Sequence, residues 1–226
     1  MKIDILTLFP ESFAPFKESI ISRAQKNGVI EINIINIRDF TLDKHKKCDD
    51  TPFGGGAGML MSVQPVYDAV KSVLTDKSKL VYPSPSGRVF NSAISQQLAQ
   101  NEHLIFICGH YEGIDQRLIE LFGADEISIG DYVLTGGEIP TMAIVDSLLR
   151  FVPGVLKEGS LEEESFSNGL LEYPQYTRPQ IFEGLAVPDV LLSGNHQEIA
   201  KFRHAESLKK TQRVRPDLLK GEKFEN

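Results

Sequence analysis

Two glycine-rich segments place polar and acidic side chains directly after short apolar runs. The first, CGHYEGID at residues 108–115, follows the apolar run 103–107. The second, SIGDYVLTGGE at residues 128–138, follows 125–127. Glycine adopts positive φ angles without penalty and lets the backbone approach a ligand closely. Because open α/β sheets bind ligands at turns that follow strands, the two segments predict a small-molecule pocket built largely from main-chain groups.

A third glycine-rich segment, TPFGGGAGM at residues 51–59, is of another kind. It lacks the Gly-Lys-Ser/Thr ending of a P-loop, and no Gly-x-Gly-x-x-Gly pattern follows a strand there. The sequence therefore disfavours an NTPase or a dinucleotide-binding enzyme. It leaves two interpretations, an exposed mobile loop and a loop that closes over a substrate. Asp49 and Asp50, just before it, could be a solvated or helix-capping pair, or a metal site.

Other reactive residue types form no familiar catalytic set. Cys48 and Cys108 are sixty positions apart, which provides neither a disulfide framework nor zinc-ligand spacing. We expect two reduced thiols, with Cys108 half-buried at the end of a strand. The five histidines contain no His-x-x-x-His pair, and no Gly-x-Ser-x-Gly elbow supplies a serine nucleophile. Covalent catalysis is therefore disfavoured, and group transfer from a bound donor fits better.

Strand and helix patterns alternate along the first 150 residues. Apolar and β-branched runs predict strands over residues 2–8, 30–37, 80–82, 103–107 and 125–129. Helical spacing predicts helices over residues 13–24, 64–74, 93–99 (capped by Ser92), 114–122 and 139–150. Strands separated by helices are typical of βαβ units, so we predict an α/β fold with a mainly parallel sheet.

The composition changes after residue 150. Residues 151–175 contain Pro153-Gly154, an acidic cluster and few periodic apolar positions, which favours a flexible interdomain linker. Helical spacing returns over 195–208, and residues 216–219 begin another helix. The predicted organisation is therefore a large domain over residues 1–157, a linker over 158–175 and a small helical domain over 176–226.

Composition and charge restrict the class of protein. Of 226 residues, 41% are hydrophobic and 24% are charged, as in ordinary soluble proteins. No apolar run is long enough to span a bilayer and no signal-peptide pattern is present, so we expect a cytoplasmic protein with no membrane partner. The net charge is −7, yet residues 199–220 carry seven basic and two acidic side chains, leaving −12 on the rest. This asymmetry favours either a phosphate-binding patch or a solvated basic helix.

Four longer blocks make the assignment more specific. They are PFGGGAGMLM (52–61), CGHYEGID (108–115), SIGDYVLTGGEIP (128–140) and SFSNGLLEYPQYTRP (165–179). Together they closely resemble the bacterial tRNA (guanine-37-N1)-methyltransferase family, of the SPOUT class. The resemblance runs over nearly the whole length, from LTLFPESF (6–13) to VLLSGNH (190–196) and the basic tail.

The resemblance implies a fold and a donor site. It implies a sheet with a deep C-terminal trefoil knot, a small helical C-terminal domain, and a homodimer with its active site at the interface. S-adenosylmethionine would be held by three loops at residues 82–87, 109–113 and 129–140. The donor-binding residues implied are Tyr82, Ser84, Pro85, Gly109, Tyr111, Glu112, Gly113, Ile129, Gly130, Asp131, Tyr132, Val133, Leu134, Gly136, Gly137 and Pro140.

The resemblance also implies catalytic roles. The general base should be Glu164, where the family more often has aspartate, and Arg150 should stabilise the guanine O6. Glu172, Ser165 and Asp50 should contact the substrate. Family members use Mg²⁺, but no cage of hard oxygen ligands is recognisable here, so no metal-binding residue is predicted and any Mg²⁺ should be weakly held. His110 stands where the family often has arginine.

Partner and alternatives follow from the same resemblance. The partner implied is tRNA, whose phosphates the basic C-terminal helices would contact while a flipped guanine enters the pocket. The linker would become ordered only when tRNA binds. Two alternatives are an RNA-binding protein of this fold that has lost its chemistry, and a related SPOUT enzyme acting on another RNA.

Overall fold

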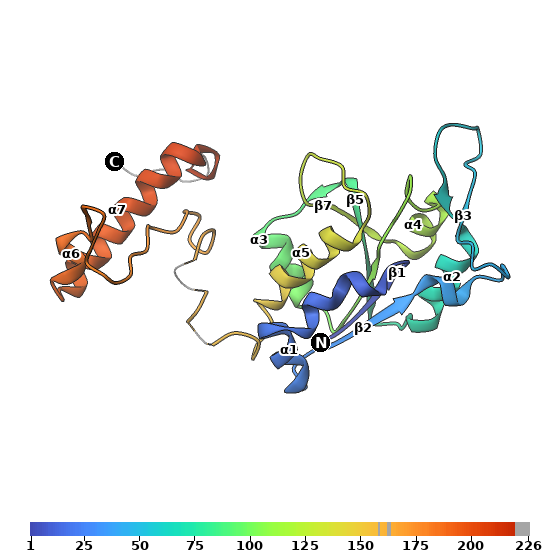
Figure 1. The fold of residues 1–226 in the computed structure, drawn as a ribbon, viewed down its shortest axis with the longest axis horizontal. Coiled ribbons are helices and arrows are strands. Elements are labelled where there is room, and N and C mark those ends of the chain that lie inside the picture. The colour runs from blue at the N-terminus through green and yellow to red at the C-terminus, as the bar shows by residue number, and fades with distance from the viewer. Residues whose placement is uncertain (158, 162–163, 220–226) are drawn as a thin grey trace. The chain divides into compact units, whose positions relative to one another are not determined.

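The computed structural model describes residues 1–157, 159–161 and 164–219 and divides them into two compact units (Figure 1). The first unit comprises Met1–Leu156 and the second Lys157–Asn226. Each unit is described separately below. None of the described helices is long and apolar enough to span a membrane.

The first unit is built on a five-stranded sheet in the order β2-β1-β6-β5-β7. All of its pairings are parallel, which confirms the α/β prediction. The strands are β1 (Lys2–Thr7), β2 (Glu31–Asn36), β5 (Ser78–Val89), β6 (His103–Ile107) and β7 (Asp125–Ser128). Because every strand runs the same way, the turns that follow β5, β6 and β7 share one edge of the sheet.

Helices cover both faces of this sheet, as the two core clusters show. One cluster joins the sheet to α1 (Ser19–Lys26), α3 (Ser92–Ala99), α5 (Glu138–Leu149) and the 3-10 helix Pro10–Lys17. The other joins it to α2 (Val63–Val73) and α4 (Gln116–Phe122). With both faces covered, the central strand β6 is buried along its whole length, as its continuous apolar run HLIFI requires.

Two short strands carry the glycine-rich segment at residues 51–59. Strands β3 (Asp49–Asp50) and β4 (Leu60–Met61) pair antiparallel, so the segment is the tip of a hairpin. Asp49 and Asp50 therefore lie in a strand, and the interpretation of the pair as a helix cap is wrong. Asp50 Oδ1 instead accepts a hydrogen bond from the N–H of Thr51 at 2.8 Å.

The structure corrects two predictions about helices. The predicted helix over residues 13–24 is two helices, because Glu18 is extended (φ −117°, ψ 164°) and Pro15 lies inside the first. The next helix is capped by Asn91, whose side chain accepts from the N–H of Ile94, and Ser92 is its first residue.

Cys108 is fully buried rather than half-buried, because it packs in the core cluster that joins the sheet to α5. Its thiol lies 3.3 Å from the Thr141 hydroxyl, and burial raises the pKa of the thiol. Cys48 is buried too, so both cysteines fit the interpretation of unreactive thiols.

The second unit contains the long helix α7 (His196–Val214), the one-turn helix α6 (Asp189–Leu192) and the 3-10 helix Pro216–Leu219. A hairpin of β8 (Ile181–Phe182) and β9 (Leu185–Ala186) precedes them. The predicted helix over residues 195–208 is confirmed, although it extends to Val214, and Asn195 caps it through a bond from Glu198 N. Its hydrophobic face is narrow, and only Ser207 and Thr211 are buried on it.

Candidate functional site

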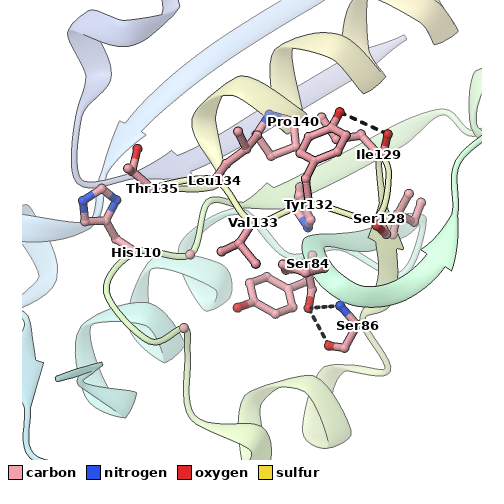
Figure 2. A pocket seen from close by; sticks show the side chains of 18 of the residues that line it. Ser84, Ser86, His110, Ser128, Ile129, Tyr132, Val133, Leu134, Thr135 and Pro140 are labelled. Carbon is pink, nitrogen blue, oxygen red and sulfur yellow. Dashed lines mark hydrogen bonds between the residues drawn. The ribbon is translucent and has the colours of Figure 1, made fainter. Parts of the chain in front are cut away.

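A cavity of about 330 Å³ opens at the carboxyl ends of β5, β6 and β7 (Figure 2). Three stretches far apart in the sequence line it. The lining residues are Tyr82, Pro83, Ser84, Pro85, Ser86, Gly109, His110, Tyr111, Glu112, Gly113, Ile127, Ser128, Ile129, Gly130, Tyr132, Val133, Leu134, Thr135, Gly136, Gly137 and Pro140. Its volume lies at the small end of the range for ligand pockets.

The first wall comes from β5, which bulges at this edge. Both Pro83 and Arg88 pair with Ile127 of β7, so the residues between them leave the ladder and return to it. Ser84 and Ser86 share a 2.8 Å hydrogen bond between their hydroxyls in this excursion, as Figure 2 shows. The two proline rings make this wall partly apolar, and the two hydroxyls make it partly polar.

Tyr82 explains why the second wall needs glycine. A Cβ on Gly109 would lie 2.8 Å from the Tyr82 hydroxyl oxygen, and one on Gly113 would lie 3.0 Å from it. The phenol therefore packs directly on the backbone of the 109–113 turn. Burial raises the pKa of Tyr82, which keeps the phenol neutral.

The glycine-rich hairpin at 51–59 braces this turn from outside. The N–H of Glu112 donates to the carbonyl of Met59 at 2.9 Å, and the N–H of Met61 donates to Gly113 at 3.0 Å. Gly58 lies so close that a Cβ there would come within 2.5 Å of Glu112 Oε1. Glu112 is thus the acidic side chain of the lining, and the hairpin fixes its position.

The third wall is the turn that follows β7. Ser128 Oγ accepts from the N–H of Gly130 and donates to the Gly130 carbonyl, which closes a tight turn. The Tyr132 hydroxyl donates back to the Ile129 carbonyl at 3.3 Å (Figure 2). Further along, the N–H of Gly137 donates to the Gly109 carbonyl at 2.7 Å, so the second and third walls are joined.

His110 connects the cavity to a buried carboxylate. Its Nδ1 lies 3.9 Å from Glu138 Oε2, and its ring lies 4.8 Å from the Phe9 ring. Glu138 is buried at the first turn of α5, where its other oxygen accepts from the Thr7 hydroxyl at 2.8 Å. A carboxylate is favourable at a helix N-terminus, and the His110 ring lies between this carboxylate and Phe9 at the margin of the cavity lining.

The structure brings together all but one of the predicted donor-binding residues. Asp131 does not line the cavity, although its neighbours Gly130 and Tyr132 do. Six further residues line it although we did not predict them. Four lie within the three predicted loops (Pro83, Ser86, His110 and Thr135), and two belong to β7 itself (Ile127 and Ser128), where an apolar and a hydroxyl side chain gave no signal of a site.

The predicted catalytic and substrate residues are distributed over the two units. Arg150 is the C-cap of α5, in the first unit, and Asp50 lies in β3, outside the cavity lining. Glu164, Ser165 and Glu172 lie in the second unit, where the N–H of Glu172 donates to Ser165 Oγ at 3.0 Å. Glu164 and Glu172 both line a second cavity, between their segment and α7.

The described residues contain no cluster of three or more histidine, cysteine, aspartate or glutamate side chains that could hold a metal ion. The cavity at the carboxyl ends of the strands carries the Glu112 carboxylate and the His110 ring among mostly main-chain and apolar groups. Such a lining is typical of a small-molecule site.

A comparison with known protein families identifies the family to which the chain belongs. The profile of the family described as "tRNA (Guanine-1)-methyltransferase TrmD" matches residues 1–221. The chain belongs to this family.

Relatives in the family support the same placement. A "tRNA (guanine-N(1)-)-methyltransferase" of Clostridium botulinum (strain 657 / Type Ba4) is 59% identical over 222 residues, covering 97% of this chain and 92% of the relative. Similarly named proteins of Clostridium beijerinckii and Ruminiclostridium cellulolyticum are 55% and 56% identical. These alignments cover 97% and 96% of this chain, and 92% and 96% of the two relatives. The second and third walls of the cavity fall in the blocks 108–115 and 128–140 by which the sequence resembles the tRNA (guanine-1)-methyltransferase family, and the first wall falls in the loop 82–87 that the resemblance implies.

Proposed function

We propose that this protein transfers a methyl group from S-adenosylmethionine to N1 of the guanine at position 37 of tRNA, next to the anticodon. Membership of the tRNA (guanine-1)-methyltransferase family supports the reaction class. The observation that carries the proposal is the convergence of three distant segments on one cavity at the carboxyl edge of the sheet. Substrate position and donor rest on the family resemblance.

The donor cavity fits S-adenosylmethionine in size and chemistry. Turns at 109–113 and 128–137 offer main-chain donors and acceptors for an adenine edge, while Pro85 and Pro140 offer apolar surface for its faces. The Glu112 carboxylate matches the positive charge of the methionine amine. Bound there, the donor would supply a methyl group activated by its sulfonium.

Proton removal is the step that this chain must catalyse with its own groups. Guanine carries a proton on N1, which must leave as the new N–C bond forms and the S–C bond breaks. We assign the acceptor of that proton to the Glu164 carboxylate. Glutamate reaches one methylene further than aspartate, so its supporting contacts must compensate for the added freedom.

Charge compensation and base selection fall to other residues. Negative charge grows on the guanine O6 as N1 loses its proton, and we assign its stabilisation to the Arg150 guanidinium. Glu172 and Ser165 lie beside Glu164 in the second unit and would contact the guanine edge. Asp50, at the base of the glycine hairpin, is proposed to contact the RNA from the first unit.

His196 and His204 lie on α7 and line the same second cavity as Glu164 and Glu172. Mg²⁺, where it is needed, would be shared with the substrate rather than caged by the chain.

Helix α7 supplies the surface for tRNA phosphates. Lys201, Lys209, Lys210 and Arg213 are exposed along it, on a chain whose net charge is −7. Basic side chains on one helix raise affinity for phosphate without reading sequence, and their contribution falls as salt is added.

We further propose a homodimer in the cytoplasm, and a trefoil knot in the first unit. Large apolar side chains at the cavity rim stay exposed in the single chain, notably Tyr111, Tyr132 and Val133, and a second copy would cover them. The knot is supported by membership of the tRNA (guanine-1)-methyltransferase family, for which the sequence resemblance implies it.

The product nucleoside tests this function. The protein is incubated with S-adenosylmethionine carrying a labelled methyl group and an unmodified tRNA transcript, which is then digested to nucleosides. We expect the label in 1-methylguanosine alone. Label in another nucleoside, or none despite donor binding, would refute the assigned reaction.

A further inference from the structure

The segment that carries the proposed base is folded against α7 by its own hydrogen bonds. The N–H of Leu171 donates to the hydroxyl of Thr211 at 2.9 Å, and Lys210 Nζ donates to the carbonyl of Glu172 at 3.1 Å. Thr211 is fully buried and its hydroxyl donates to the Ser207 carbonyl at 2.7 Å. The hydroxyl therefore has both its donor and one acceptor site committed, and its orientation is fixed.

Two backbone hydrogen bonds within the segment connect its attachment on α7 to Glu164. The N–H of Phe166 donates to the Leu170 carbonyl at 2.8 Å, and the N–H of Ser167 donates to the Glu164 carbonyl at 3.2 Å. The segment is thus a closed turn, with Phe166 at φ +77°, a conformation that costs free energy for a residue with a side chain. A strained turn of this kind persists only where its surroundings hold it.

Two arginines, one on α7 and one directly after it, contact aromatic rings at the two ends of the turn. The Arg215 guanidinium, one residue beyond α7, lies 5.9 Å from the Phe166 ring centroid, and that of Arg203 lies 4.7 Å from the Tyr173 ring. Together with Thr211 and Lys210, these residues contact the segment at four places spread over three turns of the helix.

We infer that Thr211 is a positioning residue for catalysis: its buried hydroxyl fixes the 164–172 turn on α7, and so places the Glu164 carboxylate. Helix α7 then has two tasks, contact with RNA phosphates on its exposed side and support of the base on its buried side. This inference rests on the proposed function, since it assumes that Glu164 accepts the N1 proton.

Replacement of the hydroxyl separates this role from simple packing. Thr211→Val keeps the branched shape but leaves the N–H of Leu171 without its acceptor. Because a displacement of about 1 Å can cost about 100-fold in rate, we expect kcat to fall about 10- to 100-fold. The Kd for S-adenosylmethionine should change less than about threefold, because the cavity assigned to the donor is lined by residues of the first unit alone.

Two matched variants accompany it. Thr211→Ser restores the hydroxyl and should return kcat to within about threefold of wild type. Gln212→Val introduces valine at the neighbouring position, whose side chain is exposed, and should leave kcat unchanged. The pH profile of kcat in Thr211→Val should keep the wild-type midpoint and have a lower maximum, because the base is displaced but its chemical nature is unchanged.

Hydrogen exchange on the full-length protein gives a readout that does not depend on activity. Amides of residues 165–172 should exchange faster in Thr211→Val than in wild type, with no change in the first unit. If that variant fails to fold, Thr211→Ala serves instead, because it removes the same hydroxyl that accepts from the N–H of Leu171. Unchanged exchange in the folded variant overturns the inference.

Glu164→Gln distinguishes failure of the inference from failure of the proposed function. If Glu164→Gln is inactive while Thr211→Val turns over at the wild-type kcat, Thr211 has no positioning role and the base assignment stands. If Glu164→Gln retains the wild-type rate, the base assignment itself is wrong. A Thr211→Val variant that loses activity only through a higher KM for tRNA would contradict positioning and indicate a binding role.

Discussion

Gly58 and Glu112 are in direct contact: a side chain on Gly58 would occupy the space of the Glu112 carboxylate, at 2.5 Å from its Oε1. The two residues are 54 positions apart in sequence and belong to the glycine hairpin and to the second wall of the cavity. The hairpin, for which the sequence left a mobile loop and a loop closing over a substrate as alternatives, is a structural support of the cavity in this structure.

Gly58→Ala tests this support. The new methyl group should push the Glu112 side chain out of place and weaken donor binding, so we expect the Kd for S-adenosylmethionine to rise about tenfold, as for the loss of one charged contact. Gly55→Ala is the matched control, because Gly55 also has a positive φ but nothing within 4 Å of a Cβ. Calorimetry on both variants would contradict the claim if they weakened binding equally.

Arg150→Ala tests charge compensation in the proposed reaction. An interaction made only as the N1 proton leaves should appear in kcat, which we expect to fall about 100-fold or more, with little change in the Kd for the donor. Single-turnover rates and equilibrium donor binding separate the two quantities. Weaker donor binding at an unchanged rate would reassign Arg150 to binding.

A buried network at the opposite edge of the sheet gives a prediction for stability. His103 Nε2 lies 2.7 Å from Asp4 Oδ2, and His103 Nδ1 lies 2.8 Å from the Ser78 hydroxyl. Asp4 is fully buried. His103→Ala should lower the free energy of unfolding by about 2–4 kcal/mol, because a buried carboxylate loses a partner.

Ser78→Ala is the matched control for this network, since it keeps the contact between His103 and Asp4 and removes the hydroxyl that bonds the other ring nitrogen and the N–H of Thr75. This change should cost about 1 kcal/mol. Urea unfolding of the three proteins gives both differences. Donor affinity should stay at the wild-type value in both variants, because the network lies at the amino ends of the strands. An equal loss of stability in the two variants would contradict a special role of Asp4.

Acid sensitivity should depend on Asp125 at the sheet edge. Partial burial by itself would raise the pKa of Asp125, but hydrogen bonds from Arg88 and Lys79 outweigh it and lower the pKa below its ordinary value of 3.8. A carboxyl group whose pKa is lower in the folded state stabilises the fold above its unfolded pKa and loses this contribution as the pH falls.

The difference in unfolding free energy between wild type and Asp125→Asn should therefore be largest near neutral pH. It should shrink as the pH falls through 3.8 and below. Urea unfolding at a series of pH values measures this difference. A difference that grows on acidification would have the wrong sign for this ion pair.

Regular elements were predictable from local patterns, whereas pairings across the chain were not. The central strand His103–Ile107 was predicted to the residue because its apolar run is continuous. Strand β5 was predicted as three residues but spans Ser78–Val89, since prolines and serines at 83–86 favour a turn. Only its return to Ile127 of β7, a tertiary contact, makes the later residues a strand.

The same limit applies to the site. Glycine-rich turns after strands indicated the cavity, and the resemblance supplied nearly all of its lining. Support from the hairpin and from Thr211 had no local signal, because Leu171 and Thr211 are 40 positions apart and Thr7 and Glu138 are 131 apart. Contacts over such separations depend on the fold and are invisible to periodicity.

Methyl transfer to two tRNA transcripts that differ only at position 37 tests the central claim most directly. One carries guanine there and the other adenine, and both are incubated with the protein, labelled S-adenosylmethionine and Mg²⁺. The account predicts stoichiometric incorporation into the guanine transcript and none into the other. Equal incorporation into both, or none into either while the donor binds, would contradict it.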